Sequence, residues 1–238
     1  MFYRKVYKRL FFDQTCPLCH VHPASSLGIC EGCHVDLPWN LFPCPRCGIS
    51  RDHPDDHCRC CNHKTFTVDR TFAALEYRFP LNTLLPSIKQ RYSLHHLGWL
   101  SQVFHARLED QIDQWPDVLI PVPMHALDLI RRGYNQAAIL AELLGKATSI
   151  NVTHSAIIKT RCSQRQHNLN ASQRRTNLID AFCVTSRPIA DHIALIDDVM
   201  TTGSTLNELA RLLKKQGCKR VDAWVLARTP DPDSDEDT

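Results

Sequence analysis

From residue 66 onwards, short apolar runs alternate with longer stretches of helical periodicity. Four apolar runs predict buried strands, at 117–123, 151–159, 192–199 and 221–228. Helical patterns lie at 81–108 with a candidate break near Tyr92, at 126–146 with an end near Gly145, and at 204–217 with an end at Gly217. Strands that are apolar on both faces and alternate with helices predict an α/β fold, a parallel sheet flanked by helices. Ligands bind such sheets outside the carboxyl ends of the strands.

The chain before residue 66 lacks this regularity. From Cys16 to about His63 it is rich in cysteine, histidine, proline and aspartate, and it has no periodicity long enough to build a core of its own. After Pro230 the chain carries five acids and no base, a composition typical of disorder. We therefore expect a small module at 1–65, the α/β domain at 66–229 and an acidic, disordered tail at 230–238.

The module contains nine of the twelve cysteines, and eight of these form four C-x-x-C pairs. This spacing lets two thiolates point at one ion, and two pairs complete a tetrahedral site without an open position, so we predict two structural zinc sites. Either Cys60 or Cys61 can join Cys58, and the two-residue spacing favours Cys61 and makes Cys60 the spare thiol. The six histidines of the module are alternative ligands, and the spacing leaves open which pairs share an ion. Such a module is either a clip that stabilises its neighbour or a docking surface. The predicted ligands are Cys16, Cys19, Cys30, Cys33, Cys44, Cys47, Cys58 and Cys61.

Without its acidic tail, the chain has a clear excess of basic residues. The whole sequence has 28 basic and 25 acidic residues, and without the tail the acidic residues number 20. A basic body favours anionic ligands such as phosphates or nucleic acid, although a basic surface without a specific partner explains the charge equally well. No window approaches the roughly 20 apolar residues of a membrane helix, and we expect a cytoplasmic protein without membrane insertion.

The run LIDDVMTTGST, Leu195–Thr205, places two acids at the end of an apolar strand and small hydroxyl residues at the start of a helix. Backbone N–H groups at a helix N-terminus bind phosphate well. The acids would repel that phosphate, so they bind a donor-rich group attached to it, and ribose hydroxyls, directly or through magnesium, fit this requirement. A helix cap beside a solvated Asp pair does not explain two carboxylates at this position. The expected ligand is a ribose 5-phosphate derivative.

This run resembles the fingerprint of the type I phosphoribosyltransferases. The stretches IPVPMH and RRGYNQAAILAELLG resemble the pyrophosphate loop and following helix of the ComF competence family, and IIKTRCSQRQHNLNASQRRTNLIDAF resembles its flexible catalytic loop. With the C-x-x-C module in front, the chain up to about Arg228 resembles the ComF/GntX-type proteins. The resemblance implies a type I phosphoribosyltransferase fold with a small N-terminal zinc-ribbon module, and phosphoribosylpyrophosphate with magnesium as substrate.

The resemblance also implies roles for individual residues. Asp197 and Asp198 hold the ribose hydroxyls, and Lys89, with Arg91, is a further candidate phosphate contact. The cradle for the 5-phosphate maps to Thr201, Thr202, Gly203, Ser204 and Thr205. The pyrophosphate loop maps to Val122, Pro123, Met124 and His125.

Cations must meet the negative charge that gathers on a departing pyrophosphate. Arg131 and Arg132 lie beside the pyrophosphate loop, and the polar stretch 159–175 carries five bases and no acid. Such a stretch can close over a substrate and exclude water, or it is a solvated surface that steers nucleic acid. We expect Asp197, Asp198, Lys159 and Arg161 to act in catalysis, and Arg131, Arg132 and Arg165 to bind pyrophosphate.

Two functions fit these features. The first is an enzyme that displaces pyrophosphate from phosphoribosylpyrophosphate with a nitrogen nucleophile, whose identity the sequence does not reveal. The second, which the ComF resemblance implies, is an accessory role in the uptake or use of DNA. In that role the basic surface meets single-stranded DNA or DNA-uptake proteins, and phosphoribosylpyrophosphate is a ligand only.

Overall fold

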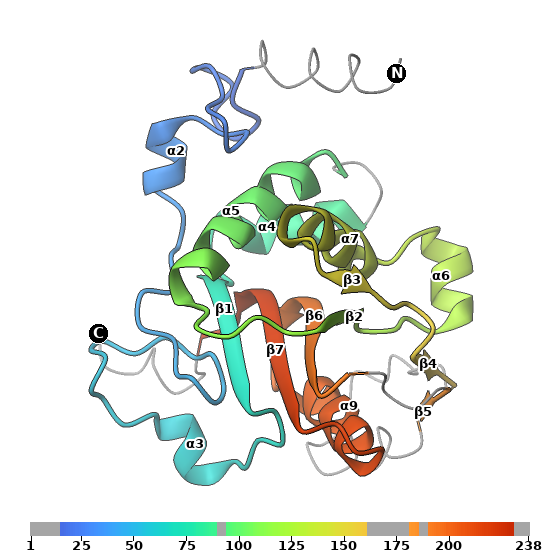
Figure 1. The fold of residues 1–238 in the computed structure, drawn as a ribbon. Helices are drawn as coiled ribbons and strands as arrows, with labels where there is room; N and C mark the ends of the chain where they lie inside the picture. Colours follow the sequence, from blue (N-terminus) through green and yellow to red (C-terminus); the bar gives the residue numbers. More distant parts are fainter. Residues whose placement is uncertain (1–14, 90–93, 161–180, 186–189, 231–238) are drawn as a thin grey trace, which may run out of the picture.

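A five-stranded parallel sheet forms the centre of the molecule (Figure 1). The computed structural model describes residues 15–89, 94–160, 181–185 and 190–230. The strands follow the order β1, β7, β6, β2 and β3, and each neighbouring pair is parallel. Their bounds are β1 Arg70–Glu76, β2 Val118–Pro121, β3 Asn151–Val152, β6 His192–Met200 and β7 Arg220–Arg228. The prediction of a parallel α/β sheet is confirmed.

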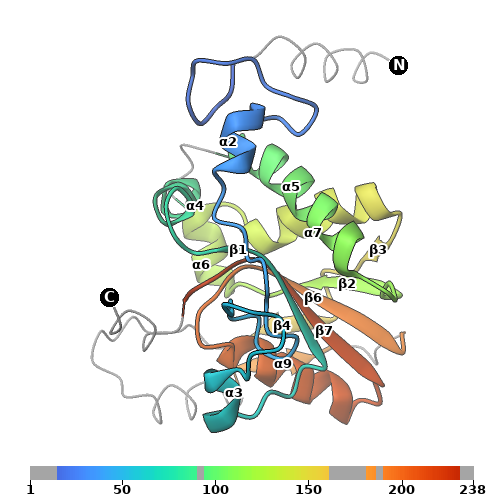
Figure 2. The ribbon, with the colours of Figure 1, turned by 90° about the vertical axis from the view of Figure 1, so that its left-hand side faces the viewer.

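Helices cover both faces of this sheet (Figure 2). One face carries α4 (Leu81–Lys89), α5 (His96–Gln111) and α7 (Gln136–Thr148), and the other carries α9 (Ser204–Lys215). The pattern at 81–108 therefore corresponds to two helices, as the candidate break near Tyr92 suggested. Within the described ranges, no helix is both long enough and apolar enough to span a membrane.

The central strands are buried on both faces because successive side chains of a strand point to opposite sides. In β7, Trp224 and Leu226 belong to the core beneath α5 and α7, whereas Ala223 and Val225 belong to the core beneath α9. All four side chains are 0% exposed. Such strands require continuous apolar runs rather than alternating ones, and the sequence has them here.

The prediction of one helix over 126–146 is wrong, because the chain forms two helices there. The first, α6 (Ala126–Arg132), ends at Gly133, whose φ of 85° is in the left-handed region that favours glycine. Gly145 does not end the second helix, α7, which continues to Thr148. A Cβ on Gly145 would lie 2.6 Å from Val152 Cγ2 and 2.8 Å from the Ile150 carbonyl, so this glycine permits close packing of α7 against β3.

The segment 151–159, predicted as one strand, divides into two strands that belong to different sheets. Its first part is β3, which pairs with β2 at the edge of the main sheet. Its second part is β4 (Ile157–Lys159), which pairs in antiparallel fashion with β5 (Phe182–Val184). A polar turn, THS, separates the two apolar parts, and this break was present in the sequence.

The cysteine-rich segment packs directly on the domain that follows it. Residues 38–45 run antiparallel along β1, where the Asn40 N–H donates to the Ala74 carbonyl at 3.1 Å and the Thr71 N–H donates to the Pro45 carbonyl at 2.8 Å. This segment covers the edge of β1, which would otherwise expose unpaired backbone groups. Its two short helices, α2 (Glu31–Val35) and α3 (Arg59–His63), lie at opposite ends of the molecule in Figure 1. The division at residues 65 and 230 stays a prediction, and residues 231–238 lie outside the described part.

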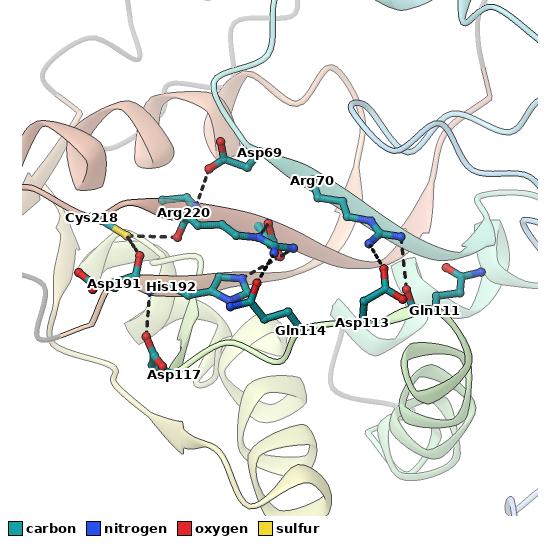
Figure 3. Close-up of polar contacts among 12 residues, drawn as sticks. Asp69, Arg70, Gln111, Asp113, Gln114, Asp117, Asp191, His192, Cys218 and Arg220 are labelled. Carbon is teal, nitrogen blue, oxygen red and sulfur yellow. Dashed lines mark hydrogen bonds and ion pairs between the residues drawn. The ribbon is translucent and has the colours of Figure 1, made fainter.

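A polar network closes the amino ends of β6 and β7, opposite the edge where ligands are expected (Figure 3). His192 Nε2 lies 2.8 Å from Asp222 Oδ2, and Arg220 donates to both oxygens of the same carboxylate. The Asp117 carboxylate accepts the N–H of His192 at 2.9 Å. Because Asp222 is 1% exposed, these partners are needed to offset its loss of hydration.

Candidate active site

A cavity of about 500 Å³ opens beyond the carboxyl ends of β2 and β6. It brings together residues that are far apart in the sequence. It also lies at the edge of the sheet where parallel sheets bind ligands. The predicted site residues that line it are Val122, Pro123, Met124, Arg131, Arg132, Lys159, Asp197 and Asp198. Five further lining residues are Lys89, noted above only as a candidate phosphate contact, and Asp128, Asn135, Gln136 and Ala137, which the sequence did not single out.

Not every predicted residue lies in this cavity. The hydroxyl-rich loop Thr201–Thr205 and His125 belong to the described part of the chain but do not line the cavity. Arg161 and Arg165 lie outside the described residues. The binding and catalytic roles predicted for all of these residues remain predictions.

The two adjacent acids occupy the last part of β6. Asp198 is 9% exposed, and its Oδ2 lies 3.2 Å from Lys89 Nζ of α4. Burial, together with the neighbouring charge of Asp198, raises the pKa of Asp197 well above its usual range. Negative charge on these two buried carboxylates is unfavourable without a partner. The site is therefore suited to a ligand that donates hydrogen bonds or positive charge to them.

The loop that follows β6 connects these acids to α9. Gly203 precedes the helix in the left-handed region, with a φ of 76°. The Thr202 hydroxyl accepts the N–H of Ser204 at 3.3 Å and lies 2.9 Å from the Ser204 hydroxyl. Thr201 and Thr202 are exposed. The loop therefore presents hydroxyl groups and a helix N-terminus to solvent, which is an arrangement that binds phosphate.

Replacing Gly203 with alanine is expected to lower stability by about 1–2 kcal/mol, because a side chain is disfavoured in the left-handed region. A Cβ there would also lie 2.4 Å from Met200 Cε and 3.1 Å from Phe66 Cε1. Urea unfolding measures the loss. The control is Gly217→Ala, which has a φ of 102° but meets nothing within 4 Å. An equal loss in both variants would show that the contacts with Met200 and Phe66 are unimportant.

The segment Val122–His125 is held in place by the starts of two helices. Asn135 caps α7 by accepting the N–H of Ala137 at 3.1 Å, and its side-chain amide donates to the Val122 carbonyl at 2.9 Å. His125 caps α6, since its Nδ1 accepts the N–H of Leu127 at 3.2 Å. His125 thus has a structural role here, and Asn135 fixes the predicted pyrophosphate loop to the wall of the cavity.

Cationic side chains line the same cavity as the two acids. Arg132 donates to Gln136 Oε1 at 3.0 Å, and Arg131 lies 3.6 Å from Asp128. Gln136 is 3% exposed, and in the described part of the chain its Nε2 has no hydrogen-bond partner. The Gln136 amide is therefore a buried donor beside the cavity that no described residue satisfies.

Sequence reasoning missed Asn135 and Gln136 for a physical reason. Both were assigned to the interior of one long helix, where polar side chains on the surface need no explanation. The Gly133-Tyr134 break moves them to the start of α7, where they face the cavity. The signal was the glycine inside an otherwise helical pattern, which is a frequent helix end.

Two groups of four cysteines have the geometry of metal sites. One contains Cys16, Cys19, Cys30 and Cys33, the other Cys44, Cys47, Cys58 and Cys61, and within each group the sulfur atoms all lie within 4.8 Å of one another. The Sγ–Sγ distances are 3.8 Å for Cys19–Cys30, 3.7 Å for Cys44–Cys61 and 3.4 Å for Cys47–Cys58. A tetrahedral site with Zn–S bonds of about 2.3 Å has sulfur atoms about 3.8 Å apart. Both groups therefore fit structural zinc.

The structure also shows which of the neighbouring thiols Cys60 and Cys61 belongs to the second group. Cys61 is a member, as its spacing predicted, and Cys60 is 7% exposed and packs in the core beneath α9. In the described part of the chain, cysteine rather than histidine completes both groups.

Comparison with known proteins gives a domain match to the second half of this chain and relatives that match nearly the whole chain. The family model for the phosphoribosyl transferase domain matches residues 103–238. Competence protein F of Haemophilus influenzae is 32% identical over 233 residues, covering 92% of this chain and 98% of its own. The DNA utilization protein YhgH of Escherichia coli O157:H7 is 34% identical over 220 residues, covering 90% and 96%.

Two more distant proteins also match part of the chain. Competence protein ComFC of Streptococcus pneumoniae is 26% identical over 151 residues, which cover 63% of this chain and 66% of its own. A purine phosphoribosyltransferase structure from Pyrococcus horikoshii Ot3 covers 56% of this chain and 76% of its own, at 22% identity and a TM-score of 0.35. From the family model and the relatives matched over nearly their whole length, this chain belongs to the competence protein F family of proteins with a phosphoribosyl transferase domain.

Proposed function

We propose that this protein binds phosphoribosylpyrophosphate with magnesium and transfers the phosphoribosyl group to a nitrogen acceptor. One observation carries the proposal: a single cavity is lined by Asp197 and Asp198, by the Val122–Met124 segment and by Arg131 and Arg132. Acids that accept hydrogen bonds from hydroxyls, in the same cavity as cations that bind phosphates, match a sugar joined to a diphosphate.

In this proposal each group has a task that follows from its position. Asp197 and Asp198 accept hydrogen bonds from the two ribose hydroxyls, and the bond from C1 of the ribose to pyrophosphate breaks as the bond to the acceptor nitrogen forms. Arg131, Arg132 and Lys159 stabilise the charge on the departing pyrophosphate. Asp197 and Asp198 carry oxygen ligands of the kind that magnesium prefers, and they would hold such an ion, which would supply positive charge beside the diphosphate.

Lys89 has a further task in this scheme. In the ligand-free structure its ammonium lies 3.2 Å from Asp198 and compensates the charge of that acid. When ribose hydroxyls occupy the carboxylate, Lys89 becomes available to the diphosphate. The ion pair thus keeps a buried acid compensated until the ligand arrives.

A second function is favoured by the names of the relatives, which are those of competence and DNA utilization proteins. In this version the protein binds single-stranded DNA or a DNA-uptake protein, and phosphoribosylpyrophosphate is a ligand rather than a substrate. Exposed cations such as Arg131, whose side chain is 65% exposed, supply the attraction for nucleic acid.

Calorimetry with phosphoribosylpyrophosphate and magnesium is expected to show binding at one site per chain. Absence of binding would contradict both proposed functions, because each of them includes this ligand. Pyrophosphate release is then measured across a set of bases and nucleotides. Release with one acceptor class supports the transferase, whereas binding without release, together with salt-dependent binding of single-stranded DNA, supports the accessory role.

A further inference from the structure

The loop proposed to hold the 5-phosphate rests on the second cysteine group, Cys44, Cys47, Cys58 and Cys61. The contact is made by Arg228, the last residue of β7, which is 4% exposed. Its Nε donates to the Cys47 carbonyl at 2.8 Å, and its NH1 donates to the Met200 carbonyl at 3.1 Å and to the Thr201 carbonyl. One buried guanidinium therefore joins the metal-binding turn to the start of the loop.

This contact fixes the direction of the loop's backbone groups. In a trans peptide unit the carbonyl oxygen and the following N–H point in opposite directions. Because the carbonyls of Met200 and Thr201 point at Arg228, the N–H groups of Thr201 and Thr202 point away from it. Thr201 and Thr202 are exposed, so this side of the loop is the side that an anion can reach.

A second set of contacts joins the same parts of the molecule. Phe66, just after the cysteine module, lies where its ring would be 3.1 Å from a Cβ on Gly203, and it packs in one core with Cys44 and Cys47. The neighbouring Thr67 donates its N–H to Asn207 Oδ1 of α9 at 2.8 Å. The first turn of α9 is thus held by the segment that leaves the second cysteine group.

Among the described residues, no hydrogen bond joins the first cysteine group to this loop. Its Cys16 and Cys30 belong to the core on the opposite face of the sheet, with α5. Gly28, between its two C-x-x-C pairs, would place a Cβ 2.8 Å from Trp99 Cβ of α5. Figures 1 and 2 show α2 of this first group at the far end of the molecule from α9.

We propose that the second cysteine group and Arg228 together set the geometry of the loop Thr201–Thr205, so that metal at this group is required for tight binding of the 5-phosphate. Arg228 is a positioning residue in this proposal because it acts through backbone carbonyls rather than on the ligand. The proposal rests on the proposed function for the identity of the ligand. The two cysteine groups then have different roles, although their sequence spacing is the same.

The test compares Arg228→Met with Arg220→Met. Both arginines lie on β7 and are bound by several hydrogen bonds, but Arg220 lies at the opposite end of the strand (Figure 3). Arg228→Met is expected to weaken phosphoribosylpyrophosphate binding about tenfold or more, because it removes the guanidinium that joins the Cys47 carbonyl to the Met200 and Thr201 carbonyls. Binding of magnesium pyrophosphate alone is expected to stay within about twofold, since the segment 122–124 is untouched. Arg228→Lys, which keeps a donor, should recover part of the affinity.

Hydrogen exchange of the backbone gives a readout that needs no ligand. Faster exchange in residues 201–206 is expected in Arg228→Met and in Cys58→Ser, and not in Arg220→Met or in Cys19→Ser of the first group. Unchanged exchange and unchanged affinity in a folded Arg228→Met protein would overturn the proposal. Equal weakening of pyrophosphate binding would also overturn it. If the unmodified protein binds no phosphoribosylpyrophosphate, the proposed function fails, and the exchange data still decide whether Arg228 positions the loop.

Discussion

Metal analysis of the purified protein is expected to give two zinc ions per chain and, for Cys44→Ser, one. The binding free energy of structural zinc is about 10–16 kcal/mol in small zinc-binding peptides, and it is also folding free energy. That amount is comparable with the whole stability of a typical domain, about 5–15 kcal/mol. Because Cys44 and Cys47 share a core with Val225 and Leu209, we expect thermal unfolding of Cys44→Ser at a much lower temperature than that of the unmodified protein.

The control for this experiment is Cys183→Ser. Cys183 is exposed on β5 and belongs to neither cysteine group, so its replacement should leave both the metal content and the unfolding temperature unchanged. A content of one zinc per chain in the unmodified protein would contradict the assignment of one of the two groups. Iron in place of zinc would contradict a purely structural reading of the sites.

Replacing Asp197 with asparagine is expected to weaken phosphoribosylpyrophosphate binding by about tenfold to a hundredfold, because a charged acceptor of ribose hydroxyls becomes a neutral one. Calorimetry measures the change. The control is Asp191→Asn, which removes an exposed acid just before the same strand, where it pairs with Lys219 at 2.7 Å. Wild-type affinity in Asp197→Asn would remove the central argument for the ligand.

The same variant is expected to be more stable than the unmodified protein when no ligand is present. The pKa of Asp197 is raised in the folded state, so the folded protein holds a proton that the unfolded chain has lost, and stability falls as pH rises from the ordinary Asp pKa towards the raised one. Each unit of that rise corresponds to about 1.4 kcal/mol. At about pH 3.5, urea unfolding should therefore give similar free energies of unfolding for the two proteins. At about pH 7, the free energy of unfolding should be clearly larger for Asp197→Asn. A variant that is less stable at both values would mean that the carboxylate makes a stabilising contact in the ligand-free protein.

Much of the fold could be predicted because its signals are local. The apolar runs that became β2, β6 and β7 are continuous, as strands covered on both faces require. The C-x-x-C spacing indicates which two sulfurs of a pair can bind one ion, and the structure decides which pairs combine. The segment 126–146 was misread because helical periodicity continues across Gly133, and only the backbone conformation there shows the break. Periodicity reports burial along one element, and it does not report where the element bends.

The site, like the fold, has features that the local sequence determines and features that only the tertiary structure determines. The sequence by itself determined which chemical groups are adjacent in LIDDVMTTGST and in the cysteine pairs, because groups a few residues apart in the chain stay close together in any fold. Only the tertiary structure decided that Lys89 meets Asp198, that Gln136 lines the cavity, and that Arg228 bridges Cys47, 181 positions away, to Thr201. These contacts depend on which strand lies beside which in the sheet, and the order β1, β7, β6, β2, β3 comes from the packing of the whole chain rather than from any short segment of it.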